Sequence, residues 1–171
     1  METYEAILTR RSIRRYKDQP VGDDVIHDLL EAAMYAPSAS DRRPWQFVII
    51  KNRNQLDTLA DLLPFGKMLH RAPLGIAVCG DLHRQRLSFW IQDCSAATQN
   101  ILLTAHDKGL GAVWIGVYPR KERIADVTRV LSLPNGILPL CVISLGYPAE
   151  VRIANNRFDS SRVHYDQWDV K

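Results

Sequence analysis

The pattern that most constrains the fold is an alternation of short apolar runs with longer segments of helical periodicity. Runs rich in β-branched residues predict four strands, at 46–51, 74–79, 112–117 and 138–145. Apolar residues at spacings of three and four predict helices at 3–8, 25–35, 54–63, 85–108 and 120–131. We also expect a shorter helix after the turn at Pro64, through Leu69, and Asp23 or Asp24 as the cap of the second helix. The order predicts an α+β or α/β protein with about four short strands covered by helices.

Length and charge narrow the class of protein further. The chain has 171 residues, and we expect one domain over 1–171 in which the polar stretch 149–171 forms a C-terminal extension. Its net charge of +3 is too small to indicate nucleic-acid binding as the main activity. No signal-peptide pattern and no apolar run of membrane-spanning length is found, so we expect a cytoplasmic protein without a membrane partner.

The cysteines and histidines do not form a recognisable metal or catalytic motif. Cys79, Cys94 and Cys141 are odd in number, far apart and set among apolar or small neighbours, which predicts reduced core residues. For the histidines we expect surface or structural roles and no metal, because none has a second ligand at metal-binding spacing: His27, His70, His83, His106 and His164.

A cationic run follows the first predicted helix. Four arginines and one serine hydroxyl lie within the six residues of Arg-Arg-Ser-Ile-Arg-Arg at 10–15. Planar guanidinium groups and a hydroxyl suit phosphate, whereas the C-terminal end of a helix carries partial negative charge. Any phosphate bound here must therefore be held by side chains. A solvated basic turn, or a contact with nucleic acid, is the alternative that this run alone leaves open.

The longest predicted helix bears on assembly. One apolar stripe runs along it, and a second stripe lies beside the first: Trp90, Cys94, Ala97, Ile101 and Ala105, then Ala96, Asn100 and Leu103. A helix that is apolar or small over so much of its surface is covered on several sides. Small residues at 94–97 allow another helix to approach closely. Burial within one subunit and burial partly against a second copy both remain open.

Common nucleotide and hydrolase motifs are absent. No Gly-x-Gly-x-x-Gly follows a strand and opens a helix, and there is no P-loop or Gly-x-Ser-x-Gly motif. The Gly-Leu-Gly at 109–111 ends a helix and starts a strand, which is typical of a C-cap. These rules alone therefore stop at an α/β protein with a candidate anion site.

Five segments read in register resemble the nitroreductase family of flavin enzymes. They are the arginine run, the Ala-Pro-Ser-Ala-Ser-Asp-Arg-Arg-Pro-Trp-Gln-Phe segment at 36–47, the helix and strand across 92–116, the Ile-Ser-Leu-Gly-Tyr-Pro-Ala segment at 143–149, and the tail at 156–165. The resemblance covers nearly the whole chain. It implies an α+β fold with a central, mainly antiparallel sheet of four to five strands surrounded by helices. It also implies an intertwined homodimer with two shared active sites at the interface.

The resemblance assigns FMN-binding roles to particular residues. The arginine run would hold the phosphate and polar face of FMN through Arg10, Arg11, Ser12 and Arg14, and the tail would bring Arg157 to the same phosphate. A segment of the partner subunit would pack against the flavin ring with Pro37, Ser38, Ala39 and Ser40. The other side of the ring would lie along Trp114, Ile115 and Gly116.

Two positions depart from the family pattern. The family usually has amides where this chain has Asp41 and Arg43, and the first of these often contacts the pyrimidine edge of the flavin. A carboxylate only accepts hydrogen bonds, so Asp41 suits a ring N–H but repels the negative charge of a reduced flavin. Arg42 or Arg43 is positioned in sequence to offset that charge.

The implied function is an FMN-dependent oxidoreductase that transfers electrons from NAD(P)H to a small organic acceptor, such as a nitroarene or a quinone. One site used alternately by both substrates implies ping-pong kinetics. The cofactor carries the chemistry, so no catalytic acid–base pair is assigned. An FMN-binding sensor or storage module without nicotinamide turnover is the main alternative, and a basic nucleic-acid binder is a weaker one.

Overall fold

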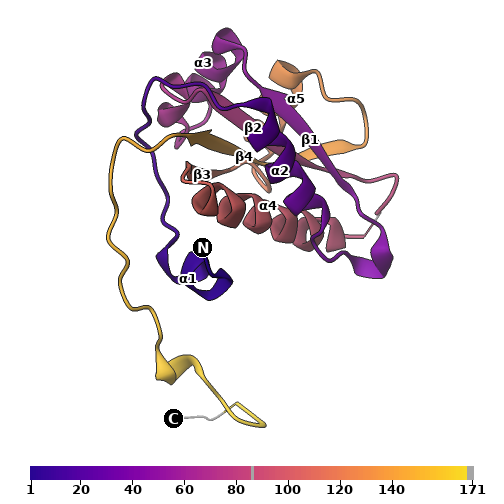
Figure 1. Cartoon of the computed structure of the whole chain (residues 1–171). Coiled ribbons are helices and arrows are strands. Elements are labelled where there is room, and N and C mark those ends of the chain that lie inside the picture. The colour runs from indigo at the N-terminus through magenta and orange to yellow at the C-terminus, as the bar shows by residue number, and fades with distance from the viewer. Residues whose placement is uncertain (86, 169–171) are drawn as a thin grey trace.

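A computed structural model describes residues 1–85 and 87–168 of the chain, and its centre is one antiparallel sheet (Figure 1). The sheet order is β1-β2-β4-β3, and every neighbouring pair is antiparallel. Its strands are β1 (Trp45–Ile50), β2 (Leu74–Asp81), β3 (Gly111–Gly116) and β4 (Ile137–Gly146). The α+β class and the mainly antiparallel central sheet that the family resemblance implies are confirmed.

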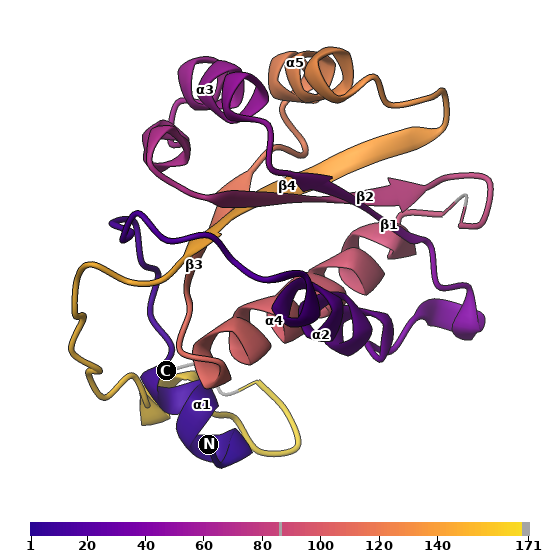
Figure 2. The ribbon, with the colours of Figure 1, turned by 45° about the horizontal axis from the view of Figure 1, so that its top comes forward.

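Helices cover both faces of the sheet, as Figure 2 shows. The two on one face are α2 (Asp23–Met34) and α4 (Phe89–Asp107), and those on the other are α3 (Arg53–Leu62) and α5 (Lys121–Leu131). Alternate residues of β2 enter different cores, because successive side chains of a strand point to opposite faces. Ile76 and Val78 pack in the α2–α4 core, whereas Ala77 and Cys79 pack in the α3–α5 core.

Most element boundaries lie within two residues of the predictions, and three features differ more clearly. The helix α4 begins at Phe89 instead of position 85. Residues 82–84 form a separate turn after β2, which the N–H of Gln85 closes by donating to the carbonyl of Asp81 at 3.1 Å; position 86 of the predicted helix lies outside the described residues. Neither Asp23 nor Asp24 caps α2, since Gly22 is the N-cap and both carboxylates lie inside the first turn. The short helix predicted through Leu69 is the 3₁₀ helix η2 (Lys67–His70).

The two stripes of α4 have different environments. All five residues of the first stripe are at most 4% exposed within a single chain. Those of the second stripe are half-buried, and Asn100 donates from Nδ2 to the carbonyl of Ala32 on α2 at 2.8 Å. Burial within one subunit thus explains the first stripe, while the second keeps exposed surface.

The three cysteines lie in the cores as predicted. Each is a buried free thiol. Burial raises the pKa of Cys79 and of Cys141 to about 12, and it raises that of Cys94 as well. Thiols with such raised pKa values are poor nucleophiles near neutral pH.

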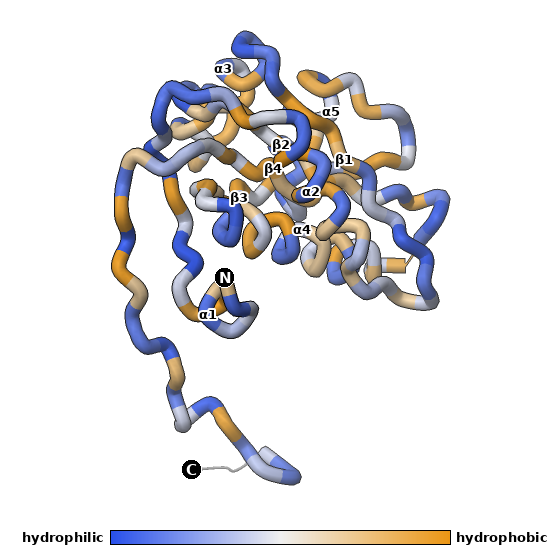
Figure 3. Tube along the Cα trace, viewed as in Figure 1, coloured by the Kyte–Doolittle hydropathy of each residue, from blue (hydrophilic) through white to orange (hydrophobic). Residues whose placement is uncertain are grey.

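The two ends of the chain lie outside the body of the molecule. The short helix α1 (Thr3–Thr9) packs near the end of α4, where the N-terminal ammonium pairs with Asp107 at 2.8 Å (Figure 1). After β4 the chain runs as an arm from residue 149, which contains only the 3₁₀ turn η3 (Ser160–Arg162); positions 169–171 of the predicted extension lie outside the described residues. Figure 3 shows apolar residues recurring along this arm, and its large apolar side chains are exposed: Val151, Ile153, Phe158, Val163, Tyr165 and Trp168.

No helix among the described residues is both long enough and apolar enough to cross a membrane.

Candidate functional site

The arginine run lies along the free edge of β3. Ser12 forms a parallel bridge with Ala112, and the N–H of Ile13 donates to the carbonyl of Ala112 at 3.1 Å. A Cβ atom at Gly111 would lie 2.5 Å from the Cγ2 of Ile13. Glycine at this position is therefore what allows the run to approach the strand so closely.

Two side chains fix the second half of the run. The hydroxyl of the half-buried Tyr16 donates to the carbonyl of Ile13 at 2.8 Å, and desolvation raises the pKa of Tyr16 so that the hydroxyl keeps its proton. The backbone N–H of Arg14 donates to Oε1 of Glu150 at 2.7 Å, and this hydrogen bond lowers the pKa of Glu150. The run is thereby attached to the chain that follows β4.

Arg10, Arg11 and Arg157 form a cationic cluster between α1 and the arm. Burial, followed by the nearby charges of Arg157 and Arg11, lowers the pKa of Arg10. Arg11 donates from Nη1 to the carbonyls of Leu8 at 2.9 Å and Arg10 at 2.7 Å, which caps the end of α1.

Within residues 1–85 and 87–168, no carboxylate forms an ion pair with Arg10, Arg11, Arg14 or Arg157. Arg11 and Arg157 also line a cavity of about 550 Å³ between α1 and the arm. Several close guanidinium groups without a counter-charge favour the binding of an anion.

A second cavity, the β3 cavity, lies beside the other end of the run. Its volume is about 410 Å³, in the range of small-ligand sites, and it is lined by Arg14, Pro64, Phe65, Lys67, Met68, Val113, Trp114 and Gly116. A Cβ atom at Gly116 would have no neighbour within 4 Å. The backbone of β3 is therefore open to a ligand at this point. The side chain of Ile115 instead lies in the α3–α5 core, so Ile115 can offer only its backbone.

Sequence reasoning missed Phe65 and Lys67, which line this cavity, and Arg123, which contacts its lining. Phe65 is 72% exposed in the turn between α3 and η2, and Lys67 pairs with Asp61 at 3.1 Å. Arg123 of α5 places its guanidinium 5.8 Å from the centre of the Phe65 ring. Arg123 also donates from Nη1 to the carbonyl of Gly116 at 3.0 Å. A phenylalanine in a turn beside Pro64 was the only local signal.

The segment 37–43 has a strained backbone that side chains hold in place. Ser40 and Asp41 have φ of 52°, and Arg43 has φ of 47°, a left-handed region that non-glycine residues rarely adopt. Ser38 accepts at Oγ from the N–H of Arg43 at 3.0 Å. The N–H of Ala39 donates to Oδ1 of the buried Asp93 at 2.9 Å.

Asp41 and Arg43 form a bidentate ion pair. Nε and Nη2 of Arg43 lie 2.6 and 2.7 Å from the two carboxylate oxygens of Asp41. This pairing holds the pKa of Asp41 below its usual value. Arg43 therefore supplies the positive charge beside Asp41 that the sequence analysis considered.

One chain does not bring all the expected site residues together. Asp41 and Arg43 line a separate cavity of about 520 Å³ with Met34, Tyr35 and Ala36. In Figure 2 the short purple helix η1 (Ala39–Asp41) lies at the opposite end of the molecule from α1. The expected site residues thus form two groups, one around the arginine run with β3 and one around η1.

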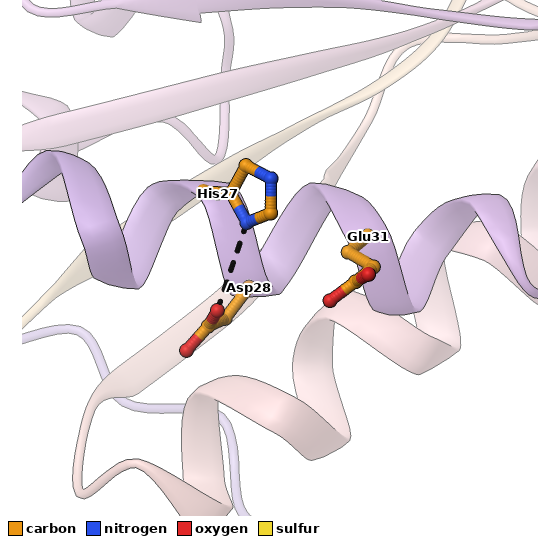
Figure 4. Close-up of side chains that lie close together, drawn as sticks. All are labelled: His27, Asp28 and Glu31. Carbon is orange, nitrogen blue, oxygen red and sulfur yellow. Dashed lines mark ion pairs between the residues drawn. The ribbon is translucent and has the colours of Figure 1, made fainter.

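A cluster on α2 has the composition of a metal site, which the sequence analysis did not identify. His27, Asp28 and Glu31 have ligand atoms within 4.8 Å of one another, and His27 lies 3.7 Å from Asp28 (Figure 4). Asp28 is already paired with Lys108, and this pairing is the main cause of its lowered pKa. We therefore describe the cluster as a network of surface ion pairs.

Comparison with known proteins gives concordant matches. The family model described as "Nitroreductase family" matches residues 7–64 and 62–147. A provisionally named NADH dehydrogenase/NAD(P)H nitroreductase of Methanothermobacter thermautotrophicus is 47% identical over 98% of this chain and 88% of its own length.

Comparison with solved structures leads to the same family. A protein of the same provisional name from Parabacteroides distasonis superposes with a TM-score of 0.95 at 47% identity, over 97% of this chain and 98% of its own. A provisionally named nitroreductase from Desulfovibrio desulfuricans, solved in complex with FMN, superposes with a TM-score of 0.85 at 31% identity, over 99% of both chains. The order of elements, the arginine run beside β3 and these matches agree, and the chain belongs to the nitroreductase family.

Proposed function

We propose that this protein is an FMN-dependent oxidoreductase that transfers electrons from NAD(P)H to a small organic acceptor, such as a nitroarene or a quinone, by a ping-pong mechanism. The observation that carries the proposal is the position of the β3 cavity. It opens onto bare backbone at Gly116 and is lined by Arg14 of an arginine run whose charges have no carboxylate partner in the described part of the chain.

The residues present fit FMN in charge and in space. The guanidinium groups of Arg10, Arg11, Arg14 and Arg157, together with the Ser12 hydroxyl, would hold the phosphate and the polar face. The flat ring would lie along Trp114 and Gly116, where the missing side chain leaves room. When bound, FMN supplies the hydride and electron chemistry. The relative solved in complex with FMN supports this assignment.

The chain itself would orient the ligand, supply charge and exclude water. Arg14 puts a positive charge on the cavity wall, which stabilises negative charge that develops there during electron transfer, whereas the charge of Lys67 is already paired with Asp61 at 3.1 Å. Pro64, Met68 and Trp114 provide apolar surface that displaces water from the reacting atoms.

We further propose that two chains complete each site. Within one chain the η1 group, Pro37 to Asp41, lies far from the arginine run (Figure 2). A two-fold dimer would bring the η1 group of one copy to the β3 cavity of the other. The exposed apolar side chains of the arm and the half-buried second stripe of α4 provide surface for such an interface.

The decisive experiment starts from the visible spectrum of the purified protein. We expect a yellow protein that releases FMN on denaturation and is bleached anaerobically by one equivalent of NADH or NADPH per site. Added acceptor should restore the colour, with parallel double-reciprocal plots in steady state. A protein that retains FMN but is never bleached by either nicotinamide would instead be a sensor or storage module. A protein that binds no FMN would refute both assignments.

A further inference from the structure

We propose that Phe65 and Arg123 determine acceptor specificity, and that they select flat acceptors with a negatively charged substituent. The proposal rests on the proposed function and names the substrate class of the same site. It is carried by the position of Arg123, which lies behind the lining of the β3 cavity and contacts two of its lining residues, the Phe65 ring and the carbonyl of Gly116.

Phe65 presents an aromatic face at the edge of this cavity. It lies in the turn between α3 and η2, lines the cavity and is 72% exposed. The free-energy cost of leaving a phenylalanine in solvent is proportional to the apolar area that stays in contact with water. A flat ligand in the cavity would cover that area and gain the additional attraction of an aromatic pair.

Arg123 fixes this aromatic ring relative to β3. Its guanidinium lies 5.8 Å from the ring centre, within the range of a cation–π contact. The same group donates from Nη1 to the carbonyl of Gly116 at 3.0 Å, on the strand where the flavin ring would lie. Arg123 therefore joins α5, the Phe65 turn and β3 at one point, so the distance between the two walls of the cavity is set.

The charge of Arg123 remains available to a ligand. Of the two cations that line the cavity, Lys67 is paired with Asp61 at 3.1 Å, and Arg14 belongs to the run that would hold FMN. Arg123 donates one hydrogen bond to a neutral carbonyl, and the described residues provide it with no carboxylate partner. A guanidinium has five N–H donors, so most of them are free for a carboxylate, sulfonate or phenolate on the acceptor.

The test compares two acceptors of nearly equal shape, 4-nitrobenzoate and 4-nitrobenzamide, which differ in charge. Either nitro group is reduced to a nitroso group with loss of water, using one hydride (two electrons and one hydrogen) from NAD(P)H and one proton from solvent: R–NO2 + NAD(P)H + H⁺ gives R–NO + NAD(P)⁺ + H2O. The quantity measured is the ratio of kcat/KM for the benzoate to that for the benzamide, in each variant relative to wild type. Intrinsic differences in reactivity cancel in this comparison.

We expect Arg123→Gln to lower the ratio by about three- to tenfold, the range for loss of a partly exposed charge-assisted hydrogen bond. Arg123→Lys, which keeps the charge, should retain most of the ratio. Phe65→Leu should weaken both acceptors about equally and leave the ratio unchanged. Arg129→Gln is the matched control, since it removes an exposed arginine from the same helix; Arg129 pairs with Asp126 and with no other carboxylate of the described residues.

A binding measurement separates failure of this inference from failure of the proposed function. Benzoate and benzamide are titrated calorimetrically into the oxidised, FMN-loaded protein, which requires no turnover. Tighter binding of benzoate, lost in Arg123→Gln and kept in Arg129→Gln, supports the pair as the specificity determinant even if no nicotinamide is oxidised. Equal affinities in wild type, or the same ratio in Arg123→Gln and Arg129→Gln, would overturn it even in an active enzyme.

Discussion

Replacement of two glycines of β3 by alanine should have opposite effects: Gly111→Ala should lower stability, and Gly116→Ala should weaken ligand binding. At Gly111 the new Cβ would lie 2.5 Å from Cγ2 and 2.7 Å from Cβ of Ile13, so the arginine run has to move away from the strand. At Gly116 the new Cβ would have no neighbour within 4 Å and would enter the β3 cavity. The first change perturbs packing, whereas the second occupies ligand space.

The loss of stability in Gly111→Ala can be estimated from the atoms that clash. The Cβ of Ile13 is attached directly to the backbone and cannot rotate out of the way, so the clash is relieved only by backbone displacement. Overpacking of this kind costs about 1–3 kcal/mol. For a chain of 171 residues this corresponds to a fall in Tm of about 2–12 °C. FMN affinity should also fall, because Arg10, Ser12 and Arg14 move with the run.

The assay measures thermal unfolding of the FMN-free protein and titration of that protein with FMN. Gly116→Ala should keep the Tm of the apoprotein within about 2 °C of wild type, because the added methyl group would clash with no neighbouring atom. The same methyl group should weaken FMN binding, because it occupies space next to the proposed flavin position. Wild-type FMN affinity in Gly116→Ala would refute the placement of the flavin ring against β3. An unchanged Tm in Gly111→Ala would refute the close packing of the arginine run.

Three further outcomes are expected. Arg14→Ala should weaken FMN binding by about ten- to a hundredfold in a fluorescence titration, the range for a lost charge-assisted bond, while the control Arg15→Ala should not. Mixing subunits of Arg14→Ala with subunits of Ser38→Trp should restore about a quarter of normal turnover, because half of the dimers are mixed and each has one intact site; confirmed mixed dimers without recovery would contradict shared sites. Burial, followed by the charge of Arg10, lowers the pKa of His106 below 6.5, so the unfolded chain binds the proton more tightly. Stability should therefore fall as pH drops below 6.5, and His106→Gln should flatten that part of a Tm–pH profile.

The elements of the sheet could be predicted because their signal is local. Each strand is a short apolar run whose alternate side chains enter opposite cores. In β2, Ile76 and Val78 enter the α2–α4 core, and Ala77 and Cys79 enter the α3–α5 core. The beginning of α4 was missed, because the polar helical pattern continues back to Gln85 while residues 82–84 form a separate turn after β2. Periodicity does not register where a turn that resembles a helix in sequence ends.

The site was predictable only in part, for a related reason. A run of arginines is visible in the sequence as concentrated charge. Phe65 and Arg123 are far apart in sequence from each other and from Arg14, and they meet at Gly116 only because α3 and α5 cover the same face of the sheet. The left-handed backbone at Ser40 and Asp41 was equally hidden, since neither position is glycine.

The arm that contributes Arg157 couples anion binding at the cationic cluster to the position of the arm beside α1. Arg11 reaches the carbonyl of Ile153 at 3.4 Å, and the charge of Arg157 acts on Arg10, so the cationic cluster is complete only when the arm lies beside α1. An anion that binds this cluster stabilises the arm in its position beside α1. By reciprocity, the arm in that position strengthens anion binding by the same free energy. Affinity for a phosphate group and order in the C-terminal residues are therefore reciprocal properties. Shortening of the arm would change ligand affinity without altering any residue of the sheet.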